Sequence, residues 1–282
     1  MATPIGNLGD LSVRALAVLG AVDAVLCEDT RVTSTLLQRY GVSATMLPLH
    51  EYNEDQQTPR ILARLAAGGR LALVSDAGTP LVSDPGYRLV RAAIAAGLPV
   101  NAIPGPNAAV MALTLSGLPP HPFLFAGFLP PRAGPRAAAI AGHRALEQAG
   151  LRATLIHYEA PHRLAETLAA LAEGLGGTRP AAVARELTKR FEEVRRGTLG
   201  ELAAHYATAE ARGEICLLVG PAPEEGAAAI DLDAALRAAL ATQSLRDAAA
   251  TVAAATGLPR KLVYQRALEL GAGAADAGGS MG

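Results

Sequence analysis

Short apolar runs alternate with longer segments of helical periodicity through most of the chain, and this alternation indicates an α/β fold. In the first part of the chain the apolar runs lie at 24–27, 45–49, 71–75 and 100–103. Helical segments separate them, as expected of parallel strands joined by crossover helices. Residues 1–117 are therefore predicted to form a doubly wound α/β lobe.

The stretch LVSDAGTPLVSDPG, from Leu73 to Gly86, begins where one of these predicted strands ends. Ligands of parallel sheets bind beyond the carboxyl ends of the strands, so residues 75–80 are placed where a ligand would lie. The loop combines acidic residues with residues that fix or free the backbone, namely Asp76, Gly78, Pro80, Asp84 and Pro85. A pair of Asx turns leading into a helix at Pro85 explains the stretch equally well, and its residues alone leave both interpretations open.

The chain opens with a turn, TPIGN, followed by an amphipathic helix for which Asp10 is the expected N-cap. Such a turn normally follows a strand, and almost nothing precedes it. Either Met1 replaces an interior residue of a longer protein, or this chain lacks its first strand. We expect the genuine start to lie upstream.

A proline-rich hinge at the start of residues 118–220 introduces a second predicted α/β lobe. Its expected strands are 123–128, 153–158, 181–185, 194–198 and 215–219. By composition, residues 221–230 are a linker, 231–270 a helical module and 271–282 a disordered tail.

Two short helices are expected in the module. Ser244 and Asp247 resemble a capping box, Thr256-Gly257 ends the first helix, and Pro259 starts the second. A helix-turn-helix that reads nucleic acid fits this pattern, and so does a small oligomerisation or packing unit. The helical signal alone favours the packing unit.

Composition bears on the cellular location of the protein and on the ligands that it can bind. No apolar stretch approaches the roughly 18 residues that span a bilayer, and the start does not resemble a signal peptide, so we expect a cytoplasmic protein. Cys27 and Cys216 lie in apolar runs and are expected to be reduced core thiols. The six histidines are scattered, which predicts no metal site, and the net charge of −1 argues against coating of naked nucleic acid.

Several common sites are absent from the sequence. It contains no Walker loop, no GxGxxG after a strand and no nucleophile elbow, which disfavours nucleoside triphosphates, dinucleotides and hydrolase chemistry.

An ordered series of motifs runs through residues 1 to about 270: TPIGNLGD, EDTR, LVSDAGTPLVSDPG, PGP, GFLP, YEAPHRL, ARELTK and GE-CLLVG. This series resembles the RsmI family of small-subunit ribosomal RNA cytidine 2′-O-methyltransferases, within the tetrapyrrole-methylase superfamily. The resemblance implies a two-lobed enzyme, usually a homodimer, that uses S-adenosylmethionine to methylate 16S ribosomal RNA near the decoding centre.

By position, the resemblance implies cofactor contacts from the first lobe and the second. They are Pro4, Ser75, Asp76, Ala77, Gly78, Thr79, Pro104, Gly105, Pro106, Tyr158, Ala184 and Glu186. A sulfonium cofactor with an adenine, ribose hydroxyls and a carboxylate suits glycine-bearing loops with a carboxylate nearby.

Methyl transfer to a ribose hydroxyl needs in-line alignment and benefits from a base. The chain has only two lysines, Lys189 and Lys261, so a lysine-rich tetrad cannot be built. The catalytic candidates are Asp29 or Asp84 as base, Arg31 to hold phosphate or ribose, and Lys189. For each of them a strand-end salt bridge or a turn cap is the plainer interpretation.

Further residues are candidates for contact with RNA, either along its path or at its phosphates. They are His50, Glu51, Asn53, Arg132, Arg136, Arg144, Arg190, Arg195, Arg196, Arg260, Lys261 and Arg266.

Two other functions stay open. A tetrapyrrole C-methyltransferase would share the fold, but TPIGN, EDTR and the helical module count against it. A non-catalytic RNA-binding or ribosome-assembly factor is supported by the short N-terminus, since loss of a strand before TPIGN would leave the cofactor loop poorly held.

Overall fold

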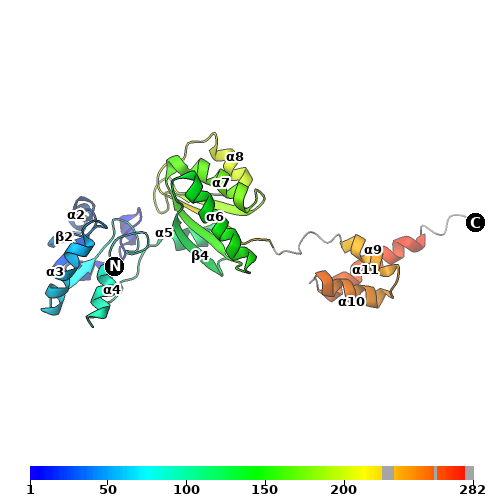
Figure 1. The fold of residues 1–282 in the computed structure, drawn as a ribbon, viewed down its shortest axis with the longest axis horizontal. Coiled ribbons are helices and arrows are strands. Elements are labelled where there is room, and N and C mark those ends of the chain that lie inside the picture. Colours follow the sequence, from blue (N-terminus) through cyan, green and yellow to red (C-terminus); the bar gives the residue numbers. More distant parts are fainter. Residues whose placement is uncertain (224–231, 257–258, 277–282) are drawn as a thin grey trace, which may run out of the picture. The chain divides into compact units, whose positions relative to one another are not determined.

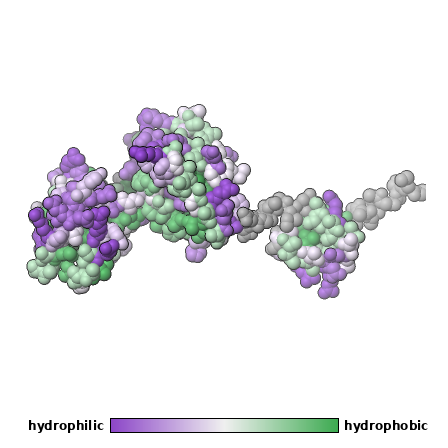
Figure 2. All heavy atoms as spheres, in the orientation of Figure 1, coloured by the Kyte–Doolittle hydropathy of each residue, from purple (hydrophilic) through white to green (hydrophobic). Residues whose placement is uncertain are grey.

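The computed structural model describes residues 1–223, 232–256 and 259–276. They form two compact units, one ending at Ala222 and the other beginning at Pro223. The first unit contains two lobes, and the second contains the helical module (Figure 1). Hydrophilic side chains cover much of the visible face of the first lobe (Figure 2).

The first lobe, residues 1–107, has three parallel strands in the order β2-β1-β3. Its elements are η1 (Leu8–Asp10), α1 (Val13–Leu19), β1 (Ala24–Cys27), α2 (Thr30–Arg39), β2 (Met46–Pro48), α3 (Glu54–Ala66), β3 (Leu71–Leu73) and α4 (Tyr87–Ala95).

Strand β1 is buried on both faces because its side chains alternate between two helical layers. Val25 and Cys27 pack in one apolar cluster with Leu19 of α1 and Leu37 of α2. Leu26 packs in another with residues of α3 and α4. This three-layer arrangement is the α/β architecture that the sequence predicts.

Two local expectations for this lobe are wrong. Ser12, not Asp10, caps α1, since its Oγ accepts a hydrogen bond from the Ala15 N–H at 3.1 Å. Residues 100–103 form no strand: they pair with none of β2, β1 and β3, and the Ile103 carbonyl instead accepts a hydrogen bond from the N–H of Ala2 at 3.3 Å.

The second lobe has a five-stranded mixed sheet in the order β4-β5-β8-β6-β7, in which only β4 and β5 are parallel. Its elements are β4 (Phe123–Phe128), α6 (Ala133–Gln148), β5 (Thr154–Glu159), η2 (Pro161–Arg163), α7 (Leu164–Leu175), β6 (Pro180–Arg185), β7 (Glu193–Thr198), α8 (Leu199–Tyr206) and β8 (Ile215–Val219).

Helices cover both faces of this sheet. Helices α6, α7 and α8 pack on one face, over Leu155, Val183 and Leu217. Helix α5 (Ala108–Ser116) packs on the other, where Ala112 contacts the cluster that contains Ile156. The sequence assigns α5 to the first lobe, but its apolar side chains belong to the core of the second. Cys27 and Cys216 are buried and free, as expected.

The module contains α9 (Leu232–Leu240), α10 (Leu245–Thr256) and α11 (Arg260–Asp276) around an apolar cluster that includes Leu236, Val252 and Val263. Helix α11 continues through residues 271–276, where the sequence predicts a disordered tail. Gly257 and the expected linker and tail residues 224–230 and 277–282 lie outside the described residues. Among the described helices, none has the length and apolarity of a membrane span.

Candidate functional site

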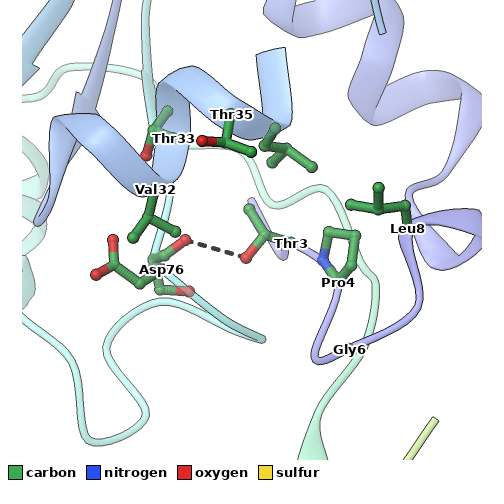
Figure 3. A pocket seen from close by; sticks show the side chains of 10 residues that line it. Thr3, Pro4, Gly6, Leu8, Val32, Thr33, Thr35 and Asp76 are labelled. Carbon is green, nitrogen blue, oxygen red and sulfur yellow. Dashed lines mark hydrogen bonds between the residues drawn. The ribbon is translucent and has the colours of Figure 1, made fainter. Parts of the chain in front are cut away.

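Hydrogen bonds with the first residues of the chain fix the loop after β3. The Thr3 N–H donates to the Gly78 carbonyl at 2.9 Å, and the Gly78 N–H donates back to Thr3 at 3.1 Å. Thr3 Oγ1 also donates to the Ser75 carbonyl at 3.0 Å (Figure 3). Ser75 is buried, and its hydroxyl donates to the Gly78 carbonyl at 2.9 Å. The Ser75 side chain therefore shapes this loop from inside.

The same loop stores backbone strain. Leu81 and Ser83 have φ angles of 70° and 68°, in the left-handed region that side chains other than glycine seldom adopt. Each such residue costs about 1–3 kcal/mol, and strained residues cluster at functional sites. Gly78, at φ 81°, has no such penalty, but a Cβ there would lie 3.2 Å from Ile5.

A cleft of 400 Å³ lies between the two lobes of the first unit. The first lobe contributes Ile5, Asp76–Thr79 and Val82–Asp84 to it, and the remainder contributes Ala108, Phe128, Tyr158–Pro161, Ala184, Leu187 and Gly213–Cys216. Phe128 and Tyr158 both line the cleft with their rings 5.7 Å apart, which gives the cleft an aromatic wall. The ring of Phe125, which does not line the cleft, lies 4.9 Å from that of Tyr158.

Seven of the sequence-predicted site residues meet in this cleft: Asp76, Ala77, Gly78, Thr79, Asp84, Tyr158 and Ala184. Pro4 and Ser75 instead line a neighbouring hollow of 330 Å³, together with residues of α2 (Figure 3). The Pro104–Pro106 turn does not line the cleft. The turn instead contacts the loop after β3, since Thr79 Oγ1 donates a hydrogen bond to the Pro106 carbonyl at 3.0 Å.

Several residues of the cleft were not predicted from the sequence. Two of them, Gly213 and Glu214, reach the cleft because of the direction of β8. Gly213 and Glu214 open the GE-CLLVG motif but precede β8, whereas ligand-binding groups are expected at the carboxyl ends of strands. Because β8 is antiparallel to β5 and β6, its first residue Ile215 lies opposite Glu159 and Arg185, at the ends of those strands. Phe128 and Ser83 fell within the quoted GFLP and SDPG motifs but carried no further signal.

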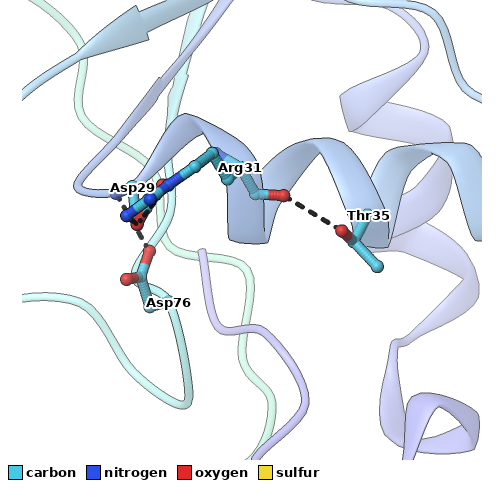
Figure 4. A network of polar contacts seen from close by, with 4 residues as sticks. All are labelled: Asp29, Arg31, Thr35 and Asp76. Carbon is cyan, nitrogen blue, oxygen red and sulfur yellow. Dashed lines mark hydrogen bonds and ion pairs between the residues drawn. The ribbon is translucent and has the colours of Figure 1, made fainter.

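The predicted catalytic residues do not form one cluster. Asp29 and Arg31 form an ion pair at the start of α2, with Arg31 Nη2 2.6 Å from the carboxylate (Figure 4). The hydrogen bonds from Arg31 lower the pKa of Asp29 to about 2, which makes Asp29 a weak base. Asp29 also caps α2, accepting from the Arg31 N–H at 2.8 Å. Its plainer interpretation, a salt bridge and a cap, is therefore the one observed.

Asp84 has the opposite environment. It lines the cleft, where burial and the neighbouring Glu28 and Asp76 carboxylates raise its pKa to about 6. The pKa of Asp76 is raised as well, chiefly by burial. A carboxylate with a pKa near neutrality in a cleft is the usual profile of a general base.

Lys189 lies in an ion-paired loop outside the cleft lining. Its Nζ is 2.7 Å from Glu186 and 2.8 Å from Glu214. Although burial lowers the pKa of Lys189, these two hydrogen bonds outweigh it and raise the pKa, so Lys189 is a poor proton acceptor. The loop braces the first lobe: the Asn7 N–H donates to Thr188 Oγ1 at 3.0 Å.

Several candidate RNA contacts have other partners. Arg136 is buried and pairs with Glu166 at 2.5 Å, so its prediction as an RNA contact is wrong. Hydrogen bonds or ion pairs with other residues of the chain also involve Asn53, Arg144, Arg195, Arg196 and Arg266. Arg144 and Arg196 are exposed all the same, as are Glu51, Arg132, Arg190, Arg260 and Lys261, while His50 lines a hollow beside Asp29. No three metal-binding side chains of the described residues gather into a metal site.

Comparison with known families agrees with this fold. The model of the tetrapyrrole (corrin/porphyrin) methylases matches residues 2–203, and that of the RsmI C-terminal HTH domain matches residues 226–271. The two-lobed fold with its interlobe cleft is thus that of a tetrapyrrole methylase.

Curated relatives narrow this class. The proteins named "Ribosomal RNA small subunit methyltransferase I" from Mesorhizobium japonicum and Pseudomonas aeruginosa are 50% and 45% identical to this chain. The alignments cover 96% and 95% of this chain and 90% and 95% of the relatives. The chain belongs to the family of ribosomal RNA small subunit methyltransferase I proteins, which confirms the resemblance found in the motifs.

Solved structures share the fold at lower identity. Diphthine synthase has a TM-score of 0.58 at 16% identity, covering 77% of this chain and 87% of its own. Uroporphyrin-III C-methyltransferase from Thermus thermophilus, complexed with S-adenyl homocysteine, has a TM-score of 0.51 at 20% identity, covering 77% and 94%. These likenesses concern the fold alone.

Proposed function

We propose that this protein transfers a methyl group from S-adenosylmethionine to the ribose 2′-hydroxyl of a cytidine in 16S ribosomal RNA, near the decoding centre of the small subunit. The observation that carries the proposal is the interlobe cleft with Asp84 in its wall, in a chain whose curated relatives are named small-subunit ribosomal RNA methyltransferases. A ribosomal substrate places the reaction in the cytoplasm.

The residues of the cleft fit the proposed cofactor. Its wall combines the Tyr158 and Phe128 rings, which suit an adenine, with the Asp76 carboxylate, which suits a cationic group. Gly78 turns the backbone of the loop at positive φ and brings no side chain into the cleft that it lines. The residues that would hold the cofactor are therefore Asp76–Thr79, Tyr158 and Ala184. When bound, S-adenosylmethionine supplies an activated methyl group.

The protein contributes a base and a fixed geometry. Asp84 is the proposed acceptor of the 2′-hydroxyl proton, because its pKa of about 6 leaves it ionised at neutral pH and still basic. Asp29, with a pKa of about 2, and the ion-paired Lys189 are less suited. The loop from Asp76 to Asp84 is fixed by Thr3 and by its strained turns, which keeps the carboxylate in place.

The module extends the proposal to substrate recognition. Arg260 and Lys261 are exposed at the start of α11 and can contact phosphate. This feature supports ribosomal RNA over a tetrapyrrole substrate, as do relatives that match nearly the whole chain, the module included.

The test is transfer from labelled S-adenosylmethionine to small ribosomal subunits that lack the modification, followed by mapping of 2′-O-methyl groups. We expect one methylated cytidine, with incorporation lost in Asp76→Ala and Asp84→Asn. The same assay with a porphyrinogen substrate tests the tetrapyrrole alternative. Methylation at a base carbon or nitrogen, or none with any substrate, would overturn the proposal.

A further inference from the structure

We propose that a hollow of the first lobe beside the cleft binds the base of the target cytidine, with Tyr52 as its stacking surface and Glu28 as the acceptor for the cytosine amino group. This inference rests on the proposed function and adds the residues that choose the base. The hollow measures 480 Å³ and is lined by Glu28, Asp29, Thr30, Arg31, His50, Tyr52 and Asp76.

The hollow adjoins the cleft that would hold the reacting groups. Asp76 lines both of them, so the two spaces meet at this side chain. Glu28 is also close enough to Asp84 for its charge to raise the pKa of that carboxyl group. A nucleotide with its ribose at Asp84 would therefore have its base within reach of this hollow.

Tyr52 provides the surface on which a base can stack. Its side chain is 95% exposed, the largest exposed fraction among the exposed large apolar and aromatic residues of the described chain. Its ring lies 6.2 Å from that of His50, which also lines the hollow and whose Nδ1 is buried with no partner among the described residues. Bases splayed from single-stranded RNA stack on such aromatic side chains.

Glu28 is the carboxylate in this hollow that is free to accept a hydrogen bond. The neighbouring Asp29 is occupied by Arg31, and Asp76 accepts from the Asp29 N–H at 3.1 Å. Glu28, in contrast, has no hydrogen bond or ion pair with any described residue. Burial and the Asp76 charge raise its pKa, so a donated hydrogen bond would stabilise its ionised form.

The Glu28 carboxylate would favour cytosine over uracil because the two bases differ at position 4. Cytosine has an amino group at position 4, which can donate a hydrogen bond to a carboxylate. Uracil has a carbonyl oxygen at that position, which a carboxylate repels. Arg31, whose side chain is 89% exposed, has Nη1 left over from its pair with Asp29 and can bind the adjoining phosphate.

The experiment compares methyl transfer to small subunits that carry either cytidine or uridine at the mapped target position. We expect Glu28→Ala to reduce the preference for cytidine about tenfold or more, and Glu28→Gln, whose amide can also donate, to admit uridine. Tyr52→Ala should raise KM for the subunits about tenfold, while Tyr52→Phe, which keeps the ring, should not.

Two variants serve as matched controls. Tyr87→Ala removes another exposed tyrosine of the first lobe, and Glu173→Gln neutralises an exposed carboxylate of α7. Both should behave as wild type, and all variants should bind S-adenosylmethionine with unchanged affinity by calorimetry. An unchanged base preference in Glu28→Ala, or equal losses in Tyr52→Ala and Tyr52→Phe, would overturn the base site while the methyltransferase function stands. A wild-type protein that methylates no subunit would overturn the function, and the base site with it.

Discussion

The backbone N–H of Asp29 donates to the carboxylate of Asp76 at 3.1 Å, so that one hydrogen bond joins the end of β1 to the loop after β3 (Figure 4). The two strands are parallel neighbours, which brings their carboxyl ends to the same edge. Asp76 also lines three hollows: the interlobe cleft, the hollow with Pro4 and the hollow with Tyr52. Its position makes it the junction of the proposed cofactor and nucleotide sites.

The proposed base gives the reaction a defined pH dependence. Since Asp84 must be ionised to accept a proton, kcat should rise with pH through about 6 and level off above it. Asp84→Asn should lower kcat by about 10² to 10⁴ and abolish this acidic limb, while the affinity for S-adenosylmethionine by calorimetry stays close to wild type. Asp29→Asn should keep the limb, because the pKa of Asp29 is about 2. An acidic limb that persists in Asp84→Asn would exclude this residue as the base.

The same carboxyl group should affect stability in the opposite sense from an ordinary aspartate. Its pKa is raised from 3.8 to about 6 on folding, so between these pH values the folded state holds a proton that the unfolded chain has released. The free energy of unfolding should therefore fall as pH rises through this window. Asp84→Asn removes that loss, and the variant should gain stability relative to wild type between pH 4 and pH 6. Denaturant titrations at several pH values measure it; a constant difference would contradict the burial of Asp84.

Gly6 allows the first loop to lie against the loop at 186–189. A Cβ at position 6 would overlap the Lys189 side chain and lie 3.0 Å from Thr188 Oγ1. Gly6→Ala should destabilise the protein by about 1–3 kcal/mol, as overpacking does elsewhere. Most of this loss should disappear in a Lys189→Ala background. Gly134→Ala in α6, where a Cβ meets nothing within 4 Å, is the control and should not destabilise. Equal costs in both backgrounds would show that Lys189 is not the obstacle.

The ion pair of Glu147 and Arg179 is buried in the second lobe. Arg179 also donates to the Gly220 carbonyl, with Nη2 at 2.7 Å. Glu147→Ala leaves the guanidinium buried without its counter-charge, which should cost about 3–5 kcal/mol of unfolding free energy. Glu210→Ala, which breaks the exposed pair with Arg212, should cost less than about 1 kcal/mol. Chemical denaturation followed by circular dichroism compares the two, and similar costs would refute the effect of burial.

Local patterns in the amino-acid sequence were enough to predict the α/β architecture and most of its elements. Strand β1 illustrates why, since four apolar residues followed by a charged turn specify a buried strand without reference to distant residues. The Asn107 cap of α5 was likewise predictable, because a cap is a local contact: its side chain accepts from the Val110 N–H. The resemblance of the motifs implied that Asp76 and Tyr158 contact the same cofactor, and both line the cleft although they belong to different sheets.

The choice of Asp84 over Asp29 as the proposed base rests on contacts that form only in the folded chain. Asp29 and Asp84 look alike in sequence, each beside a strand end or a turn. The pair with Arg31 lowers the pKa of Asp29, whereas burial and the carboxylates of Glu28 and Asp76 raise the pKa of Asp84. The fold also buries Arg136, and it brings Gly213 and Glu214 to the cleft because β8 runs antiparallel to β5. Burial, pairing and strand direction arise from contacts between residues far apart in the chain, which local sequence patterns do not encode.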